Sequence, residues 1–197
     1  MKFKRIVLFD FDGTLFRGDS TKEAFFLLFE NWFSFILHYY LFNLKGIVIL
    51  IFTGNALVLA ECRRRVLLNN KQTLMLKFRY LDKANIFFES TLDVVKKYVK
   101  MDLRVVIISA GYFEVIEGYI ADLFPATIIA NSLLYPSKNS INYERKLEVL
   151  YERLGKDIEI MASYGNTEGD YAMLNAGQEA FLVDSFGQLS AYARGNV

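Results

Sequence analysis

The chain has 197 residues, of which 53% are hydrophobic and 23% charged, with only 2 prolines. This composition excludes a disordered or collagen-like chain, and the length is sufficient for one core domain with a substantial insertion. The 23 basic and 22 acidic residues leave a net charge of +1, so the charge does not indicate nucleic acid as a partner. Cys62 is the only cysteine, which excludes an intramolecular disulfide.

Short β-branched runs alternate with helical patterns along most of the chain. Apolar runs that end in polar residues or glycine predict strands at residues 5–9, 103–108, 126–130, 158–163 and 180–183. Helices are predicted between them at residues 91–100, 112–123, 143–154 and 169–176. This alternation indicates an α/β fold, with a parallel sheet covered by helices on both faces.

The first two predicted strands are separated by far more chain than one crossover helix needs. Residues 17–87 are therefore predicted to form an inserted helical cap, and residues 1–16 and 88–197 the α/β core. Ligands of open parallel sheets bind beyond the carboxyl ends of the strands. The residues that fall there are Asp10, Ser109, Asn166 and Asp170. We expect these side chains to meet at one site.

Asp10 and Asp12 directly follow the first strand and stand two residues apart, so alternation points both to the same side. Gly13 then allows a sharp turn, and Thr14 offers a hydroxyl and an N–H. Two carboxylates this close repel each other unless a cation or proton lies between them. With Mg²⁺ present, one carboxylate can attack phosphorus while the other handles the leaving-group proton. A surface turn with two solvated aspartates is the alternative.

Residues 9–15, Phe-Asp-Phe-Asp-Gly-Thr-Leu, resemble the first motif of the haloacid dehalogenase-like hydrolases, and three later segments resemble the other motifs in order. The resemblance implies a Rossmann-like core and a Mg²⁺-dependent phosphomonoester hydrolase with an aspartyl-phosphate intermediate. It implies that Asp10 is the nucleophile and a metal ligand. Asp12 would be the general acid and base, and its backbone carbonyl would contact the metal.

Ser109, Ala110 and Gly111 resemble the second motif, which binds the phosphoryl oxygens through a hydroxyl and backbone N–H groups. A plain helix N-cap is the alternative for the serine. Lys146 resembles the third-motif lysine, which neutralises the phosphoryl group and the nucleophile. Arg145 is a rival cation, but a stripe of leucines predicts that Lys146 lies next to the buried face.

Residues 165–170 resemble the fourth motif, an acidic loop that completes the metal site. Asn166 stands where the family usually has aspartate, and it removes one negative charge while keeping an oxygen ligand. The resemblance therefore implies metal ligands at Asp10, Asp12, Asn166 and Asp170. It also leaves an alternative function, a phosphate-binding or regulatory module with weakened catalysis.

The position of the cap, between the first and second motifs, resembles the phosphoserine phosphatase-like branch of the family. In that branch an acidic residue after the first motif and a cap arginine hold the substrate. Asp19 and the arginines Arg63 and Arg65 are the candidates here. Asp19 with Ser20 is equally consistent with a helix N-cap, and the arginines with a solvated face or a contact to anionic headgroups.

Residues 32–45 are rich in aromatic and aliphatic side chains and include His38, which is expected to be structural. The uncharged windows 31–44 and 46–60 are shorter than the roughly 18 residues of a spanning helix, so no transmembrane segment is predicted. Such a surface suits a peripheral membrane contact or an acyl chain, and packing within the cap or in a homodimer is the alternative. The predicted substrate is a small phosphorylated metabolite or a lipid phosphate, and the predicted location is the cytoplasm or the inner face of its membrane.

Overall fold

The computed structural model describes residues 4–29, 56–83, 85–135, 141 and 145–193. The chain divides into two compact units, Met1–Ser20 with Asp82–Val197, and Thr21–Leu81. The boundaries drawn from the sequence at residues 17 and 87 stay a prediction.

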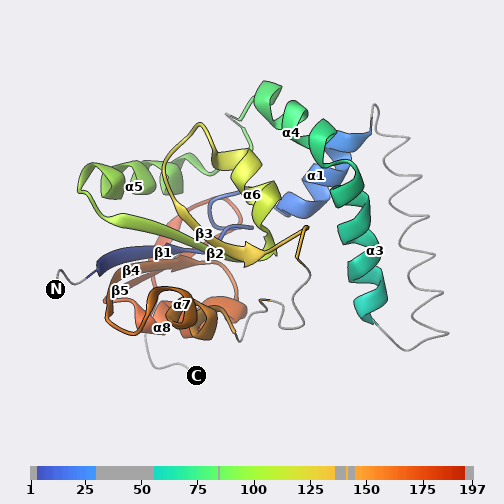
Figure 1. The fold of residues 1–197 in the computed structure, drawn as a ribbon. Helices are drawn as coiled ribbons and strands as arrows, with labels where there is room; N and C mark the ends of the chain where they lie inside the picture. The colour runs from blue at the N-terminus through green and yellow to red at the C-terminus, as the bar shows by residue number, and fades with distance from the viewer. Residues whose placement is uncertain (1–3, 30–55, 84, 136–140, 142–144, 194–197) are drawn as a thin grey trace. The chain divides into compact units, whose positions relative to one another are not determined.

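The first unit contains a six-stranded sheet with the order β3-β2-β1-β4-β5-β6 (Figure 1). Its strands are β1 (Lys4–Phe9), β2 (Arg104–Tyr112), β3 (Thr127–Asn131), β4 (Ile158–Gly165), β5 (Glu179–Val183) and β6 (Leu189–Ala191). All neighbours pair in parallel except β5 and β6, which are antiparallel. The predicted α/β fold with a mostly parallel sheet is confirmed. The sequence does not predict β6, because three residues are too few for a recognisable pattern.

Helices cover both faces of this sheet (Figure 1). The helices of the first unit are α5 (Glu89–Lys100), α6 (Phe113–Ile120), α7 (Lys146–Leu154), the 3₁₀ turn η1 (Glu168–Asp170) and α8 (Tyr171–Ala176). Helices α5 and α6 pack on one face, and α7 and α8 on the other. Helix α6 begins one residue later than predicted, because Tyr112 still pairs with Asn131 of β3.

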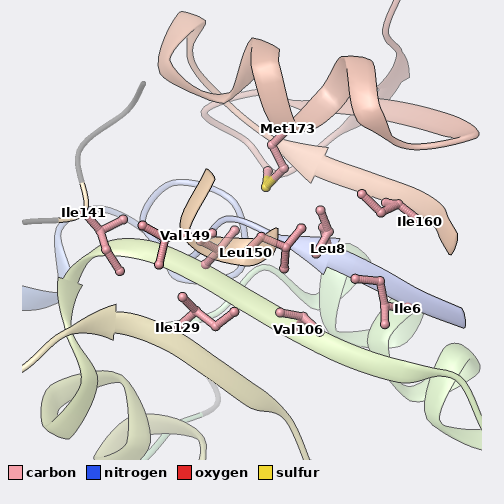
Figure 2. Close-up of a cluster of buried hydrophobic side chains, with 10 residues drawn as sticks. Ile6, Leu8, Val106, Ile129, Ile141, Val149, Leu150, Ile160 and Met173 are labelled. Atoms are coloured by element: carbon pink, nitrogen blue, oxygen red, sulfur yellow. The ribbon is translucent and has the colours of Figure 1, made fainter. Parts of the chain in front are cut away.

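Alternate residues of β1 face opposite sides of the sheet. Ile6 and Leu8 join a buried cluster with Leu150 of α7 and Met173 of α8 (Figure 2). Because side chains alternate along a strand, Asp10 continues the phase of Ile6 and Leu8. The strand therefore delivers Asp10 to the side of the sheet that α7 covers.

Aromatic side chains on the other face fix the register of the central strands. The ring of Tyr164 stacks between Phe9 and Phe181, with centroid distances of 4.5 and 4.9 Å. The Tyr98 hydroxyl lies 3.0 Å from that of Tyr164. One residue after Phe9, the Asp10 N–H donates to the Tyr164 carbonyl at 2.9 Å, which extends the ladder by one residue. Backbone pairing and ring packing together therefore fix the position of Asp10 at the end of β1.

The segments by which the chain leaves and re-enters the first unit lie side by side. The Phe88 N–H donates to the Leu15 carbonyl at 3.0 Å, and the Arg17 N–H to the Ile86 carbonyl at 2.8 Å. Arg17 Nε adds a hydrogen bond to the Phe87 carbonyl at 2.8 Å. These bonds hold the end of the turn that follows Asp10, residues 15–17, against residues 86–88.

In the part of the chain that the structure describes, the second unit consists of helices and short connections. They are α1 (Ser20–Leu28), whose first residue belongs to the first unit, α3 (Ala56–Asn69) and α4 (Lys71–Tyr80). Leu67, Leu74 and Phe78 are buried. The aromatic stretch at residues 32–45 lies outside the described residues. None of the described helices combines the length and the apolar character needed to cross a membrane.

Candidate active site

Lys146, the first residue of α7, lies at the centre of a buried charged group. Its Nζ donates to Asp10 Oδ1 at 2.5 Å and to Asp170 Oδ1 at 2.7 Å. Burial alone would lower the pKa of Lys146, but the two carboxylates outweigh it and raise that pKa, so the amine stays charged. Arg145, the rival cation, instead pairs with Glu148 along α7 at 2.9 Å. The structure therefore brings Lys146, and not Arg145, to Asp10.

Asp10 is 5% exposed, and its two carboxylate oxygens have different neighbours. Oδ1 accepts from Lys146, while Oδ2 lies 3.3 Å from the Thr14 hydroxyl. Burial raises the pKa of Asp10 to about 7; the charge of Lys146 opposes this shift, and those of Asp170 and Asp12 add to it. The Asp10 carboxyl therefore changes charge near neutral pH.

The first residue of α1 holds the side chain of Asp12. The backbone N–H of Ser20 donates to Asp12 Oδ1 at 2.7 Å, as expected of a carboxylate at a helix N-terminus. Burial raises the pKa of Asp12 to about 6, and hydrogen bonding from Ser20 limits the rise. A carboxyl group with such a pKa can hold or accept a proton near neutral pH, as a general acid and base must.

Ser109, Ala110 and Gly111 form an irregular segment near the carboxyl end of β2. The pairing with β3 shifts register between Ile108 and Tyr112, which takes the three residues out of the ladder. The Gly111 N–H donates to Ser109 Oγ at 3.0 Å. Tyr112 occupies the N-cap of α6, so Ser109 is not a plain N-cap serine. A Cβ at Gly111 would lie 3.5 Å from Asp12 Oδ2, so this segment passes close to Asp12.

Asp170 holds both its own loop and Lys146. Its Oδ2 accepts from the backbone N–H groups of Asn166 at 3.0 Å and Thr167 at 3.1 Å. Its Oδ1 accepts from Lys146, and the side chain is 1% exposed. The carboxylate thus acts as an internal cap and as the second counter-ion of the lysine.

The oxygen atoms at this edge suit a hard divalent cation. The Thr14 hydroxyl lies 3.3 Å from Asp10 Oδ2 and 3.5 Å from Asn166 Oδ1, so a carboxylate and an amide oxygen flank the same position. Mg²⁺ prefers such oxygen ligands. Across the residues described, no group of three or more His, Cys, Asp or Glu side chains is arranged to hold a metal. Asn166 contributes a neutral amide oxygen to this position.

For the residues predicted to bind substrate from the cap, the structure gives the local surroundings. Asp19 is exposed and precedes the Ser20 that contacts Asp12. Arg65 belongs to α3, where its Nε contacts Glu61 at 2.8 Å. Hydrogen bonds from Arg64 and Arg65 lower the pKa of Glu61 to about 2. The role of Asp19, Arg63 and Arg65 in substrate binding stays a prediction.

Sequence reasoning missed Asn131, the last residue of β3. Its Nδ2 donates to the Ala110 carbonyl at 2.7 Å, inside the predicted phosphate-binding segment. The signal that identified Asp10, a polar residue directly after a predicted strand, also applied to Asn131.

The sequence model of the haloacid dehalogenase-like hydrolases matches residues 7–175, which include every residue of the charged group. The chain belongs to this family. No curated protein sequence gives a significant match.

Solved structures confirm the fold of this haloacid dehalogenase-like hydrolase. A protein of unknown function from Bordetella pertussis Tohama I is 15% identical with a TM-score of 0.68, and the match covers 91% of this chain and 89% of that one. A family hydrolase from Salmonella enterica serovar Typhi is 16% identical with a TM-score of 0.57, over 89% of this chain and 61% of the other. A phosphoserine phosphatase in apo form is 16% identical with a TM-score of 0.52, over 91% and 85%.

Gly13 and Gly18 offer a matched test of how tightly the turn is packed. Both have positive φ, 75° and 101°, but a Cβ at Gly13 would lie 2.1 Å from Asn166 Nδ2, whereas one at Gly18 meets nothing within 4 Å. Both Ala variants should lose about 1 kcal/mol from backbone strain. Gly13→Ala should lose roughly 1–3 kcal/mol more from overpacking, measured by urea unfolding. Equal losses in the two variants would show that the contact with Asn166 is not tight.

The raised pKa of Asp10 predicts a pH dependence of stability. Its pKa is higher in the folded protein, about 7, than its ordinary 3.8, so the native state holds the proton more tightly. Stability from this group is therefore lost as the pH rises from about 4 to about 7. In Mg²⁺-free buffer, the unfolding free energy of wild type relative to Asp10→Asn should fall across this window, measured by urea unfolding. If the difference in unfolding free energy between the two proteins stays constant with pH, the pKa of Asp10 is not raised in the folded state.

Proposed function

We propose that this hydrolase is a Mg²⁺-dependent phosphomonoesterase that forms an aspartyl-phosphate on Asp10. The observation that carries the proposal is the asymmetry of the Asp10 carboxylate. Lys146 holds Oδ1 at 2.5 Å, while Oδ2 has only the long 3.3 Å contact with Thr14 among its hydrogen bonds to described residues. A fixed carboxylate with one weakly engaged oxygen suits nucleophilic attack.

In the first step, Asp10 Oδ2 forms a bond to phosphorus as the bond between phosphorus and the leaving oxygen breaks. Asp12 gives its proton to that oxygen, for which a pKa of about 6 is suited. Asp12 then takes a proton from a water molecule, which attacks phosphorus and releases phosphate from Asp10. Lys146, the Ser109 hydroxyl and the Gly111 N–H would balance charge on the phosphoryl oxygens.

Asp10, the Asp12 carbonyl and Asn166 would hold Mg²⁺. Asp170, predicted as a further ligand, has both carboxylate oxygens engaged by Lys146 and by the N–H groups of Asn166 and Thr167. When bound, this ion supplies positive charge that reduces repulsion between the carboxylate and the phosphoryl group. The buried oxygen donors around Thr14 support the choice of a hard cation.

The proposed substrate is a small phosphorylated metabolite or a lipid phosphate. Similarity of fold to a phosphoserine phosphatase supports the phosphomonoester class, although at 16% identity it carries no further detail. A screen of phosphorylated metabolites and lipid phosphates would separate the two sources. Peripheral membrane contact or a homodimer, and phosphotransfer to a second acceptor, remain further proposals for the same enzyme.

A phosphate-binding or regulatory module with weakened catalysis is the second candidate. Two observations favour it. The neutral Asn166 lies beside the proposed metal position, and both oxygens of Asp170 already accept hydrogen bonds. In this case Mg²⁺ and phosphate would bind, but turnover would be slow.

We expect Asp10→Asn to abolish release of phosphate from p-nitrophenyl phosphate, because an amide cannot form the phosphoenzyme. The loss should be at least about 10³-fold in kcat. EDTA should have a comparable effect on wild type, reversed by added Mg²⁺. The matched control is Asp157→Asn, the same change at an exposed carboxylate, which should leave kcat unchanged. Full activity in Asp10→Asn would exclude the mechanism.

Asn166→Asp should distinguish the two candidate functions. The added charge should raise Mg²⁺ affinity by about tenfold or more, measured by calorimetry. If the protein is an active phosphatase, wild type already turns over at saturating Mg²⁺. If it is a weakened module, substantial turnover appears only in the variant. Unchanged Mg²⁺ affinity would show that residue 166 does not contact the metal.

A further inference from the structure

The carboxamide of Asn131 contacts backbone groups of two segments that are distant in the sequence. Its Nδ2 donates to the Ala110 carbonyl at 2.7 Å and to the Ile141 carbonyl at 3.3 Å. Its Oδ1 accepts from the Ile141 N–H at 2.8 Å. Both N–H donors and the carbonyl are thus matched to partners, which is a specific arrangement for an amide side chain.

The contact with Ala110 determines the direction of the next N–H. No cis peptide bond occurs among the described residues, and in a trans peptide the carbonyl and the following N–H point in opposite directions. Because the Ala110 carbonyl points to Asn131, the Gly111 N–H points away from it, towards Ser109 Oγ at 3.0 Å. Asn131 thereby orients a donor of the segment assigned to the phosphoryl group.

The contact with Ile141 connects Asn131 to the buried cluster of the core. Ile141 is 8% exposed and packs in the cluster that contains Val149 of α7 (Figure 2). Asn131 holds both the N–H and the carbonyl of Ile141, as a neighbouring strand would. Asn131 therefore also ties the end of β3 to a residue of the buried cluster.

We propose that Asn131 is a positioning residue for phosphoryl binding, which sets the direction of the Gly111 N–H. This inference rests on the phosphatase function proposed above. It assigns Asn131 no contact with the substrate.

Ser132 provides the matched control, because it anchors the same loop without contacting Ala110. Its hydroxyl donates to Glu114 Oε1 at 2.8 Å and accepts from the N–H groups of Leu134 at 3.1 Å and Tyr135 at 3.2 Å. A role of Asn131 in loop stability alone would make Ser132→Ala and Asn131→Ala equivalent in their effect on activity.

The experiment compares Asn131→Asp, Asn131→Ala and Ser132→Ala with wild type. Aspartate keeps an acceptor for the Ile141 N–H but cannot donate to the Ala110 carbonyl. Both Asn131 variants should lower kcat/KM for p-nitrophenyl phosphate by about 10-fold to 100-fold, whereas Ser132→Ala should stay within about twofold. Thermal unfolding is measured for each, so that activity is compared at temperatures where all are folded.

A second readout does not require turnover. The ¹⁵N–¹H resonance of Gly111 should shift when inorganic phosphate and Mg²⁺ are added to wild type, and this shift should be lost or reduced in Asn131→Asp. If wild type has no hydrolytic activity, the proposed function fails, and the resonance still decides the role of Asn131. Folded Asn131 variants with wild-type kcat/KM, or with an unchanged Gly111 shift, would overturn the inference.

Discussion

The buried contact of Lys146 with two carboxylates is the constraint on which the rest of the core depends. Asp10, Lys146 and Asp170 are each no more than 5% exposed, so none can exchange its partner for water. Removal of one member of a buried ion pair typically costs about 3–5 kcal/mol, because the other charge is left uncompensated. The end of β1, the start of α7 and the η1 turn must therefore come together in one arrangement, and the packing of Ile6 and Leu8 against α7 serves the same geometry.

One ammonium does not balance the acidic groups around it. Asp10 and Asp170 share Lys146, and Asp12 lies close by, held by a backbone N–H. Burial raises the pKa of Asp10 to about 7 and that of Asp12 to about 6, and neighbouring negative charges add to both shifts. Both values place a protonation of this site near neutral pH. A bound divalent ion would lower both pKa values, so metal affinity and protonation are linked properties of the same charged group.

The sequence predicts the strands and the polar residues at their ends better than the hydrogen bonds that link the site residues. Five strands are predictable because strands buried on both faces are continuous apolar runs, and Asp10 and Ser109 are predictable because ligands gather at the carboxyl ends of such strands. The bond from Ser20 to Asp12 and the bonds of Asn131 are not, because a side chain can contact any backbone group that the fold brings near. The register shift that frees Ser109 to Gly111 from the ladder has the same origin, since it depends on the pairing between β2 and β3. Arg63 and Arg65 of α3 are predicted to bind substrate from the resemblance to the phosphoserine phosphatase-like branch, and in the structure Arg65 contacts Glu61 one turn away.

The departure at Asn166 has a consequence that the motif alone does not give. A neighbouring acid could in principle replace the missing charge, and Asp170 is the candidate in the sequence. In the structure its Oδ2 accepts from the N–H groups of Asn166 and Thr167, and its Oδ1 accepts from Lys146. Turning the carboxylate towards a metal would leave buried N–H groups without an acceptor and Lys146 with one counter-ion, each at a cost of about 1–3 kcal/mol or more. Gly165 adds a steric reason, because a Cβ there would lie 2.5 Å from the Asp170 Cβ, which shows how closely backbone and side chain pack. The same interactions that fix Lys146 therefore oppose a rotation of Asp170 towards the proposed metal, so the charge that Asn166 lacks is not supplied by this neighbouring acid.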